Sequence, residues 1–455
     1  MNYIPLFSSN QTSRSGIFGG TATSAGPGLR RSVWSILVVF LLVSSLLSLS
    51  CRGNQDTTIQ GNTMGTSYSI KLRHVPRDLD VAELKDQIDE LLHTVDFRFS
   101  SWQQDELYRI NSHPVGQTTE ISSDFCLVLY KSSLVWKASD GEFDPTIGRL
   151  IDLWGFGPSE QTRGPTDQEV SQAKKQIGFD KLQIRYLPGV SGKDYESDTL
   201  AFRNHEKDSG QKSPGSNNAA SDDAREDSSD ASESTTETEP GDSRVHEDSA
   251  ERYRQESGND APIQGCSLVR TTDLNLNLSA IAKGHGVDRV ANLLRKNGIQ
   301  DFMVEIGGEV KTGPEGSFRI GIERPNYDGT RSLYTVLESQ NSCIATSGNY
   351  RNFFEKDGKI YSHILDPETG RPGLSRIQSA TIVGPDCALA DALATAAMIL
   401  SPEQTRKMLT SIKEITGQSY EYLILESGEL VHGDTRNFQI TEYTSSGLDS
   451  IRVQK

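Results

Sequence analysis

The sequence predicts a mixed α/β fold of the α+β kind, and three observations lead to this expectation. In residues 318–322, Phe and two Ile alternate with other residues, as in a strand with one buried face. Residues 388–400 form a run rich in Ala and Leu, which favours a helix. Strand and helix patterns then follow one another without strict βαβ alternation, which indicates an α+β or mixed α/β arrangement.

Further elements are expected along the chain. A helix is predicted where one side carries the apolar residues Leu84, Ile88, Leu91, Leu92 and Val95, within residues 81–97. A second helix is expected over residues 125–138. Further expected strands span residues 182–187, 267–278, 302–305, 343–346 and 380–383, and residues 361–370 are expected to form a strand that enters a Pro and Gly turn. We expect one folded domain over residues 60–440, followed by a tail over residues 441–455.

Residues 275–298 are expected to pass from a strand into a helix. Ser279 stands where a helix N-cap belongs, and Asn297-Gly298 supplies a C-terminal stop. One face of the helix would carry the apolar residues Val287, Val290, Ala291 and Leu294. Residues 280–286 lie between the expected strand and the expected helix and are interpreted as a Gly-rich turn that contains Lys283. Such a turn suits an anion, because free N–H groups and the helix dipole face it. The alternative is an ordinary amphipathic helix with a surface lysine.

Charge is distributed very unevenly along the 455 residues. Residues 191–260 hold 19 acidic and 8 basic residues, so −11 of the net charge of −16 lies there and about −5 elsewhere. This segment has almost no Val, Ile or Leu, so it cannot bury enough apolar surface to offset the entropy of ordering. We therefore expect a disordered acidic insertion in a surface loop, with an acidic arm for a partner or for metal ions as the alternative. No basic patch with aromatic residues suggests a nucleic-acid partner.

The N-terminal region has the composition of a targeting segment. Residues 1–29 are rich in Ser, Gly and Thr, which predicts a disordered leader. Within residues 30–51, Arg30-Arg31 precede an apolar run that ends before Cys51, as in an export signal of the bacterial lipoprotein type. An uncleaved membrane anchor and a soluble secreted form are the alternatives. All three place the folded part outside the cytoplasm, and the first two attach it to the membrane.

The five cysteines, Cys51, Cys126, Cys266, Cys343 and Cys387, are far apart in the sequence and form no CxxC pair. Their spacing therefore indicates neither a zinc site nor a disulfide framework.

Two patterns suggest chemistry. Asp391 and Thr395 are four residues apart on the predicted helix, so their side chains share one face and could form a hard-oxygen site for Mg²⁺. The alternative is an aspartate favoured by the helix dipole and a threonine that bonds back to its own helix. His363 lies on an expected strand near Asp366, where it is either a packed histidine with one hydrogen bond or a general base.

Nine segments, in the order found here, resemble the motifs of the ApbE family of flavin transferases. They cover roughly residues 62–399 and read MGTSYSI, FSSW, EFDPTIG, LWGFGP, LNLSAIAKGHGVD, EIGGEV, IATSGNYRNFF, YSHILDPETGRP and DALATAAM. The resemblance implies a two-lobed fold with the flavin dinucleotide between the lobes and a magnesium ion on its pyrophosphate.

The resemblance also implies roles for particular residues. The FAD site would be lined by Met64, Trp102, Glu142, Phe143, Asp144, Lys283 and Ile364. The metal would be held by Asp391, Thr395 and the backbone carbonyl of Ala280, and His363 would be the residue essential for transfer. Asn277 stands where the family often has Asp, so this FAD contact departs from the pattern.

The implied activity is Mg²⁺-dependent transfer of FMN from FAD, the substrate, to a Ser or Thr hydroxyl of an acceptor protein, with release of AMP. The family's acceptors are flavoprotein subunits of membrane redox complexes, so we expect the enzyme on the extracytoplasmic (periplasmic) face of a bacterial inner membrane. Two alternatives stay open: a metal-dependent FAD pyrophosphatase, and a non-catalytic flavin-binding lipoprotein.

Replacement of residues 191–260 by a short Gly/Ser linker is expected to leave FAD turnover and the melting temperature unchanged. The segment has no core to contribute, and the entropy of loop closure changes slowly with loop length. Turnover assays and thermal melts of the two proteins check this; a large loss of either would show that the segment folds or docks.

Overall fold

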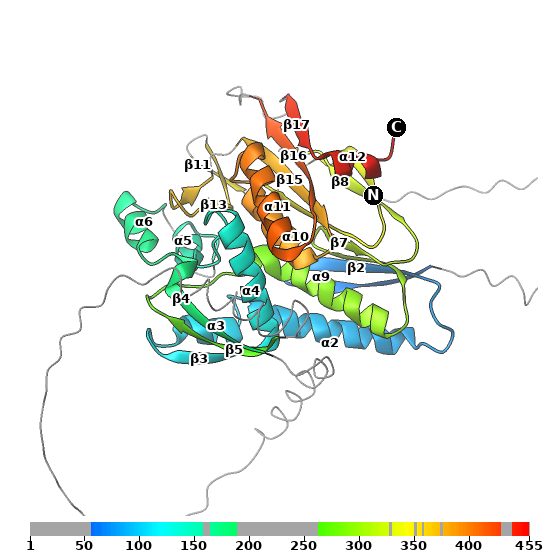
Figure 1. The fold of residues 1–455 in the computed structure, drawn as a ribbon, viewed down its shortest axis with the longest axis horizontal. Coiled ribbons are helices and arrows are strands. Elements are labelled where there is room, and N and C mark those ends of the chain that lie inside the picture. The colour runs from blue at the N-terminus through cyan, green and yellow to red at the C-terminus, as the bar shows by residue number, and fades with distance from the viewer. Residues whose placement is uncertain are drawn as a thin grey trace, which may run out of the picture. The chain divides into compact units, whose positions relative to one another are not determined.

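An eight-stranded antiparallel sheet forms the centre of the fold, in the order β1-β2-β6-β7-β10-β15-β16-β17 (Figure 1). The computed structural model describes residues 56–157, 164–188, 263–326, 330–349, 353–356, 359–373, 376–428 and 439–454. The strands of this sheet are β1 (Thr57–Thr63), β2 (Thr66–Arg73), β6 (Asp301–Ile306), β7 (Glu309–Thr312), β10 (Cys343–Gly348), β15 (Ile377–Gly384), β16 (Glu421–Ser427) and β17 (Ile440–Thr444).

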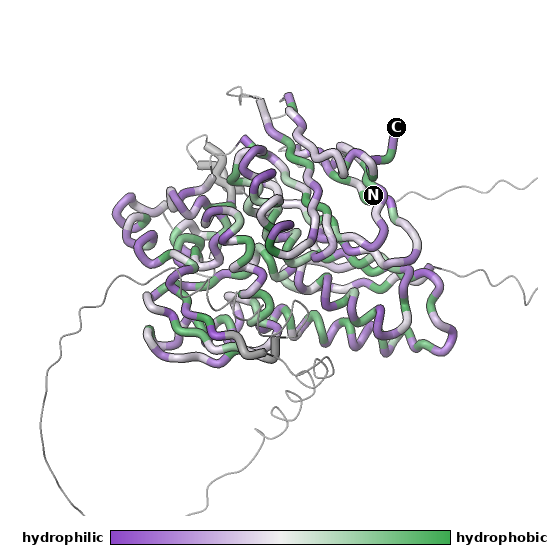
Figure 2. The backbone as a smooth tube through the Cα atoms, viewed as in Figure 1, coloured by the Kyte–Doolittle hydropathy of each residue, from purple (hydrophilic) through white to green (hydrophobic). Residues whose placement is uncertain are grey.

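Helices cover one face of this sheet, and apolar alternation explains why. In β10, Cys343 and Ala345 belong to the large core on the helical side, whereas Ile344 joins a second core on the other side. The longer helices that contribute to the large core are α2 (Val81–Phe99), α4 (Ser123–Ala138), α9 (Ser279–Lys296), α10 (Cys387–Ala397) and α11 (Pro402–Thr416). Figure 2 shows the hydrophobic stretches gathered where these helices meet the strands.

The other face of the large sheet carries a smaller hydrophobic cluster. It is covered by the hairpin of β8 (Phe318–Glu323) and β9 (Leu333–Ser339) together with α12 (Ser446–Ile451). Leu448 of α12 is fully buried there. The chain therefore remains folded past residue 440, and the tail expected over residues 441–455 is wrong as far as residue 454: it forms most of β17 and all of α12.

A second, three-stranded antiparallel sheet has the order β3-β5-β4. Its strands are β3 (Thr118–Ser122), β5 (Ile263–Arg270) and β4 (Leu182–Pro188). The remaining elements are α3 (Glu106–Ser112), α5 (Gly148–Leu153), α6 (Asp167–Lys174), a 3₁₀ turn (Phe179–Lys181), and the short hairpins β11 (Phe353–Lys356) with β12 (Lys359–Ser362) and β13 (Leu365–Asp366) with β14 (Arg371–Pro372).

The structure confirms the mixed α/β class and most of the predicted elements. The helix expected over residues 81–97 is α2, and the helix expected over residues 388–400 is α10. The strand expected over residues 267–278 is wrong in its second half, because β5 ends at Arg270. Residues 275–277 lie along the loop at residues 145–148: the Gly148 N–H donates to the Asn275 carbonyl at 2.9 Å, and the Asn277 N–H donates to the Pro145 carbonyl at 2.7 Å.

Two disulfides join segments that are distant in the sequence. Cys126 of α4 pairs with Cys266 of β5, and Cys343 of β10 pairs with Cys387 of α10. The expectation that spacing indicated no disulfide framework is therefore wrong, because the fold brings together cysteines 140 and 44 residues apart.

The predicted leader (residues 1–29), export segment (30–51) and acidic insertion (191–260) lie outside the described residues. Within the described ranges, no helix combines the length and hydropathy that a membrane span needs.

Candidate active site

The residues expected to form a Gly-rich turn are instead the first two turns of helix α9. The helix begins at Ser279, so Ser279 is not the N-cap, and residues 280–286 are helical. The N-cap is Leu278, which has no capping side chain, and Oδ1 of the preceding Asn277 accepts the N–H of Ser279 at 3.0 Å and the Ser279 hydroxyl at 2.6 Å. Lys283 therefore projects from the second turn of α9, which gives it a fixed direction.

Helices α9 and α10 cross at Gly284, and this contact explains the glycine. A Cβ at this position would lie 2.1 Å from the backbone oxygen of Cys387, closer than any side chain can approach. At the same crossing the Gly284 N–H donates to Oδ2 of Asp391 at 3.0 Å. The absence of a side chain thus allows a carboxylate of α10 to reach the backbone of α9.

Lys283 is the centre of the charged cluster at this crossing. Its Nζ lies 2.9 Å from Oε1 of Glu309 and 3.4 Å from Oδ1 of Asp391, and both carboxylates are buried. Burial alone would lower the pKa of Lys283, but Asp391 and Glu309 outweigh it, so the pKa is raised and the lysine stays charged.

Glu309, which begins β7, has an incompletely satisfied carboxylate. Its Oε2 atom is buried and has no hydrogen-bond partner within the described part of the chain. Burial raises the pKa of Glu309 to about 7, although Lys283 opposes the shift. The cluster thus holds two buried carboxylates against one lysine.

Thr395 lies one helical turn beyond Asp391, as the sequence spacing predicted. Its hydroxyl donates back to the Asp391 carbonyl at 3.2 Å and lies 3.2 Å from the hydroxyl of Ser347 on β10. The back-bonded arrangement that we considered as the alternative is therefore present. It does not exclude a metal role, because a hydroxyl oxygen that donates one bond can still accept a cation.

These oxygen donors fit the chemistry of Mg²⁺. The Asp391 carboxylate, the Thr395 hydroxyl and the Ala280 carbonyl are hard ligands carried by two helices in direct contact. The orphaned oxygen of Glu309 adds negative charge that a divalent cation would neutralise. The residues present are therefore suited to such an ion.

Met64 lies against the same helix. It occupies the turn between β1 and β2 with φ of 47°, and a Cβ on Gly286 of α9 would be 3.0 Å from its Cε atom. Gly307, with φ of 59°, leaves room for the stem of Lys283, since a Cβ there would lie 3.3 Å from the Lys283 Cδ atom. Met64, Lys283 and the Gly307 turn are thus brought together.

The loop with Glu142, Phe143 and Asp144 is tied to the start of α9 through the Pro145–Asn277 bond. Phe143 and Asp144 are buried. Asp144 accepts the Thr146 N–H at 2.8 Å, the Thr146 hydroxyl at 2.6 Å and the Phe179 N–H at 3.2 Å. The buried side chains of Phe143 and Asp144 therefore hold the loop against the interior of the protein.

Glu142 differs from its two neighbours. Its Oε2 has no hydrogen-bond partner among the described residues. Burial raises the pKa of Glu142, and Asp366 and Glu368 raise it further. The loop thus faces the segment that follows His363, so the structure brings these two predicted site regions together.

His363 connects β12 to β13 and is half-buried. Its ring meets Phe156 edge-on, with the centroids 6.4 Å apart. The next residue, Ile364, packs in one cluster with Ala397 and Met398 at the C-terminal end of α10. His363 is therefore anchored near the end of the helix that carries Asp391 and Thr395.

Trp102 is the most exposed of the predicted site residues. It follows α2 and is 69% exposed. Its role in FAD binding stays a prediction from the resemblance.

Sequence reasoning missed Glu309 and Ser347. Glu309 lies in the segment EIGGEV, which carries the resemblance, and it follows Gly307-Gly308, where the chain turns sharply into β7, but no role was predicted for it. Ser347 lies in the segment IATSGNYRNFF, directly after the strand expected over residues 343–346, and its proximity to Thr395 depends on the packing of β10 against α10.

His285 on α9 is buried, and its Nε2 has no hydrogen-bond partner among the residues that the structure describes. It is 1% exposed, it packs edge-on against Phe99, and its Nε2 lies 3.7 Å from Oδ1 of Asp124. Burial lowers the pKa of His285 to about 4, and the attraction of Asp124 only partly opposes this. The imidazole is therefore neutral in the folded protein at neutral pH.

Acid is expected to destabilise the protein through His285. The unfolded chain takes up a proton near pH 6.5 and the folded one only near pH 4, so stability is complete above pH 6.5 and falls as the pH drops between these values, by up to about 3 kcal/mol. Urea unfolding at pH 7 and at pH 4.5 should show a smaller pH effect in His285→Gln than in the wild type. The exposed-site control His93→Gln should keep the wild-type slope, and equal slopes in all three proteins would contradict the assignment.

Comparisons with known proteins show which family the chain resembles over most of its length. The model of the ApbE family matches residues 64–204 and 222–417. An FAD:protein FMN transferase from Vibrio cholerae is 32% identical over 370 residues, which are 80% of this chain and 87% of that protein. Another, from Escherichia coli strain K12, is 25% identical over 82% of this chain and 88% of its own length.

Solved structures show the same likeness. The flavin transferase ApbE from Vibrio cholerae is 26% identical, has a TM-score of 0.60, and aligns over 88% of this chain and all of its own. An ApbE protein from Thermotoga maritima, at 21% identity and the same TM-score and coverage, shows the likeness of fold alone. The family match over most of the chain and the 32% identity to a full-length relative establish that this chain belongs to the ApbE family.

Proposed function

We propose that this protein is an FAD:protein FMN transferase that moves the FMN part of FAD onto a Ser or Thr hydroxyl of an acceptor flavoprotein and releases AMP. The observation that carries the proposal is the cluster of Lys283, Asp391 and Glu309 at the crossing of α9 and α10. The chain aligns with most of the length of relatives that are named FAD:protein FMN transferases.

The cluster is suited to a pyrophosphate. Lys283 keeps its positive charge because its pKa is raised, so its Nζ can donate to phosphate oxygens. Asp391, Thr395 and the Ala280 carbonyl would hold Mg²⁺ beside it. When bound, this ion supplies charge neutralisation on the phosphates, which phosphoryl transfer needs more than covalent help.

His363 is the proposed general base. The acceptor hydroxyl gives its proton to the imidazole as its oxygen forms a bond to the FMN phosphorus. The bond from that phosphorus to the bridging oxygen breaks, and AMP leaves with the electron pair. The position of Ile364 against the end of α10 supports this role, because it keeps His363 on the side of the metal helix.

The location and the partner are also proposed. The apolar segment before Cys51 and the two disulfides support an extracytoplasmic, membrane-attached enzyme, because disulfides persist in oxidising compartments. An acceptor subunit of a membrane redox complex fits that location.

The proposal is tested by incubating the protein with FAD, Mg²⁺ and an acceptor peptide that carries one Ser or Thr. Mass analysis should show the peptide heavier by one FMN phosphoester, together with stoichiometric AMP. Free FMN and AMP without peptide labelling, on every acceptor tried, would replace the transferase by a pyrophosphatase. Tight FAD binding without turnover would show that the protein is a non-catalytic flavin-binding protein.

A further inference from the structure

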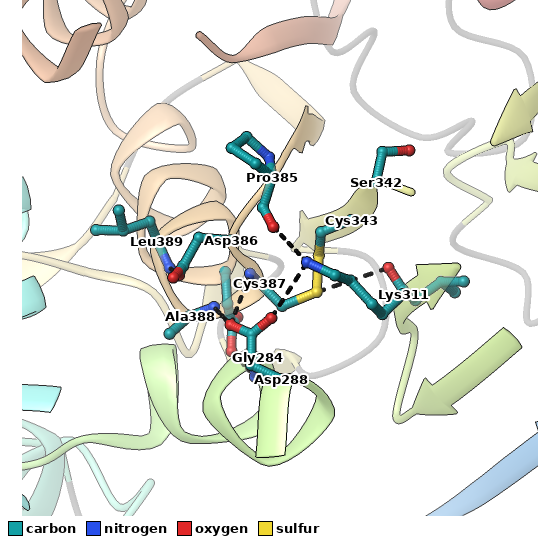
Figure 3. The surroundings of a disulfide bond; sticks show 12 residues. Gly284, Asp288, Lys311, Ser342, Cys343, Pro385, Asp386, Cys387, Ala388 and Leu389 are labelled. Carbon is teal, nitrogen blue, oxygen red and sulfur yellow. Dashed lines mark hydrogen bonds and ion pairs between the residues drawn. A yellow bond between two sulfur atoms is a disulfide. The ribbon is translucent and has the colours of Figure 1, made fainter. Parts of the chain in front are cut away.

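Asp288 on α9 is bound to the first residues of α10. Its Oδ2 accepts the backbone N–H of Cys387 at 2.8 Å and that of Ala388 at 3.1 Å (Figure 3). Asp288 lies one helical turn after Gly284, and Cys387 lies one turn before Asp391. The two contacts, Gly284 with Asp391 and Asp288 with Cys387, therefore connect successive turns of the two helices.

This second contact completes the N-terminal cap of α10 with a side chain from another helix. The helix already has its own N-cap, Asp386, whose Oδ1 accepts the Leu389 N–H at 2.9 Å. Because the carboxylate that takes the N–H groups of Cys387 and Ala388 belongs to α9, the same contact also joins the start of α10 to α9. A slip of α10 by one turn would move Asp391 by about 5.4 Å, well out of reach of Lys283.

The surroundings hold the Asp288 carboxylate in place. Lys311 of β7 lies with Nζ 3.4 Å from Asp288 Oδ1 and also donates to the Pro385 carbonyl. Lys131 of α4 lies 3.9 Å from Asp288 Oδ2 and 2.5 Å from Asp386. All four charged side chains are largely buried.

We infer that Asp288 is a positioning residue for the reaction: it fixes the register of α10 on α9 so that Asp391 and Thr395 meet Lys283 at the phosphate site. The inference rests on the proposed Mg²⁺ site, and it adds a residue that touches neither substrate nor metal. The Cys343–Cys387 disulfide ties the same end of α10 to β10, the strand that carries Ser347.

The test compares Asp288→Ala and Asp288→Asn with the wild type in initial-rate assays at varied Mg²⁺ and varied FAD. Loss of a contact that orients metal ligands typically weakens metal binding about 10–100-fold. The concentration of Mg²⁺ for half-maximal rate should rise by this factor in Asp288→Ala, while the KM for FAD at saturating Mg²⁺ changes little. Asp288→Asn keeps an oxygen for the two N–H groups and should restore most of the Mg²⁺ response.

The matched control is Asp80→Ala. Asp80 caps α2, where its Oδ1 accepts the N–H groups of Ala82 and Glu83, and α2 holds no proposed metal ligand. This variant should lower the melting temperature without changing the Mg²⁺ requirement. A purely structural role for Asp288 would make Asp288→Ala behave in the same way.

The outcomes distinguish failure of the inference from failure of the proposed function on which it rests. A folded Asp288→Ala with wild-type dependence on Mg²⁺ overturns the inference alone, as does an Asp288→Asn variant as impaired as Asp288→Ala. If Asp288→Ala does not fold, Asp288→Glu decides, because its longer side chain displaces α10 while keeping the charge; a wild-type Mg²⁺ response there overturns the inference. A wild-type enzyme that needs no divalent ion overturns both the metal site and the inference.

Discussion

Asp391→Asn is expected to lower FMN transfer on the order of 10²–10³-fold while the protein stays folded. The substitution removes the charge that would hold Mg²⁺, and an ion that stabilises charge on phosphates is worth several kcal/mol in the transition state. The amide oxygen can still accept the Gly284 N–H, so the crossing of α9 and α10 is kept. Initial rates of peptide labelling at increasing Mg²⁺ measure the effect.

FAD affinity should fall less than turnover in this variant, because the charge matters most as the phosphates react. Asp86→Asn, which removes the same charge from an exposed position on α2, serves as the control and should match the wild type. Circular dichroism and a thermal melt must first show that Asp391→Asn is folded. Full activity at low Mg²⁺ would remove Asp391 from the metal site.

His363→Ala is expected to lower transfer about 10²–10⁴-fold, as loss of a general base does, with FAD and Mg²⁺ binding kept. The physical reason is that the acceptor hydroxyl then has no group to take its proton. Peptide labelling and AMP release measure the loss, and equilibrium titration with FAD measures binding.

Stability distinguishes this role from packing. A histidine that only packs against Phe156 would lower the melting temperature and leave the turnover of the folded fraction unchanged. His93→Ala, at an exposed position on α2, is the control for the loss of an imidazole. Labelling by His363→Ala at the wild-type rate would assign the base to another residue.

The start of α9 shows where prediction from sequence succeeds and where it fails. The apolar face of the helix and its end at Asn297-Gly298 could be predicted, because both depend on local spacing. The Gly-rich residues 280–286 were interpreted as a turn, because glycine is common in turns. Gly284 is instead required by a close approach of the Cys387 carbonyl, which comes from 103 positions further along the chain and leaves no local trace.

The site shows the same division. The spacing of Asp391 and Thr395 predicts their common helix face, and the structure confirms that both lie on α10. Glu309 belongs to the cluster only because β7 pairs between β6 and β10 and passes beside α9. No periodicity in the sequence predicts which strands pair, so the contact of Glu309 with Lys283 could not be predicted. The pairing of Cys343 with Cys387 was missed for the same reason.

The Cys126–Cys266 disulfide has a consequence for the integrity of the chain. Its two cysteines stand on either side of residues 191–260, whereas Cys343 and Cys387 both follow that segment. A protease that cuts anywhere within residues 191–260 therefore divides the polypeptide without releasing either piece. The nicked protein would migrate as a single species on a non-reducing gel and separate into two fragments only after a thiol reductant opens the bond between α4 and β5.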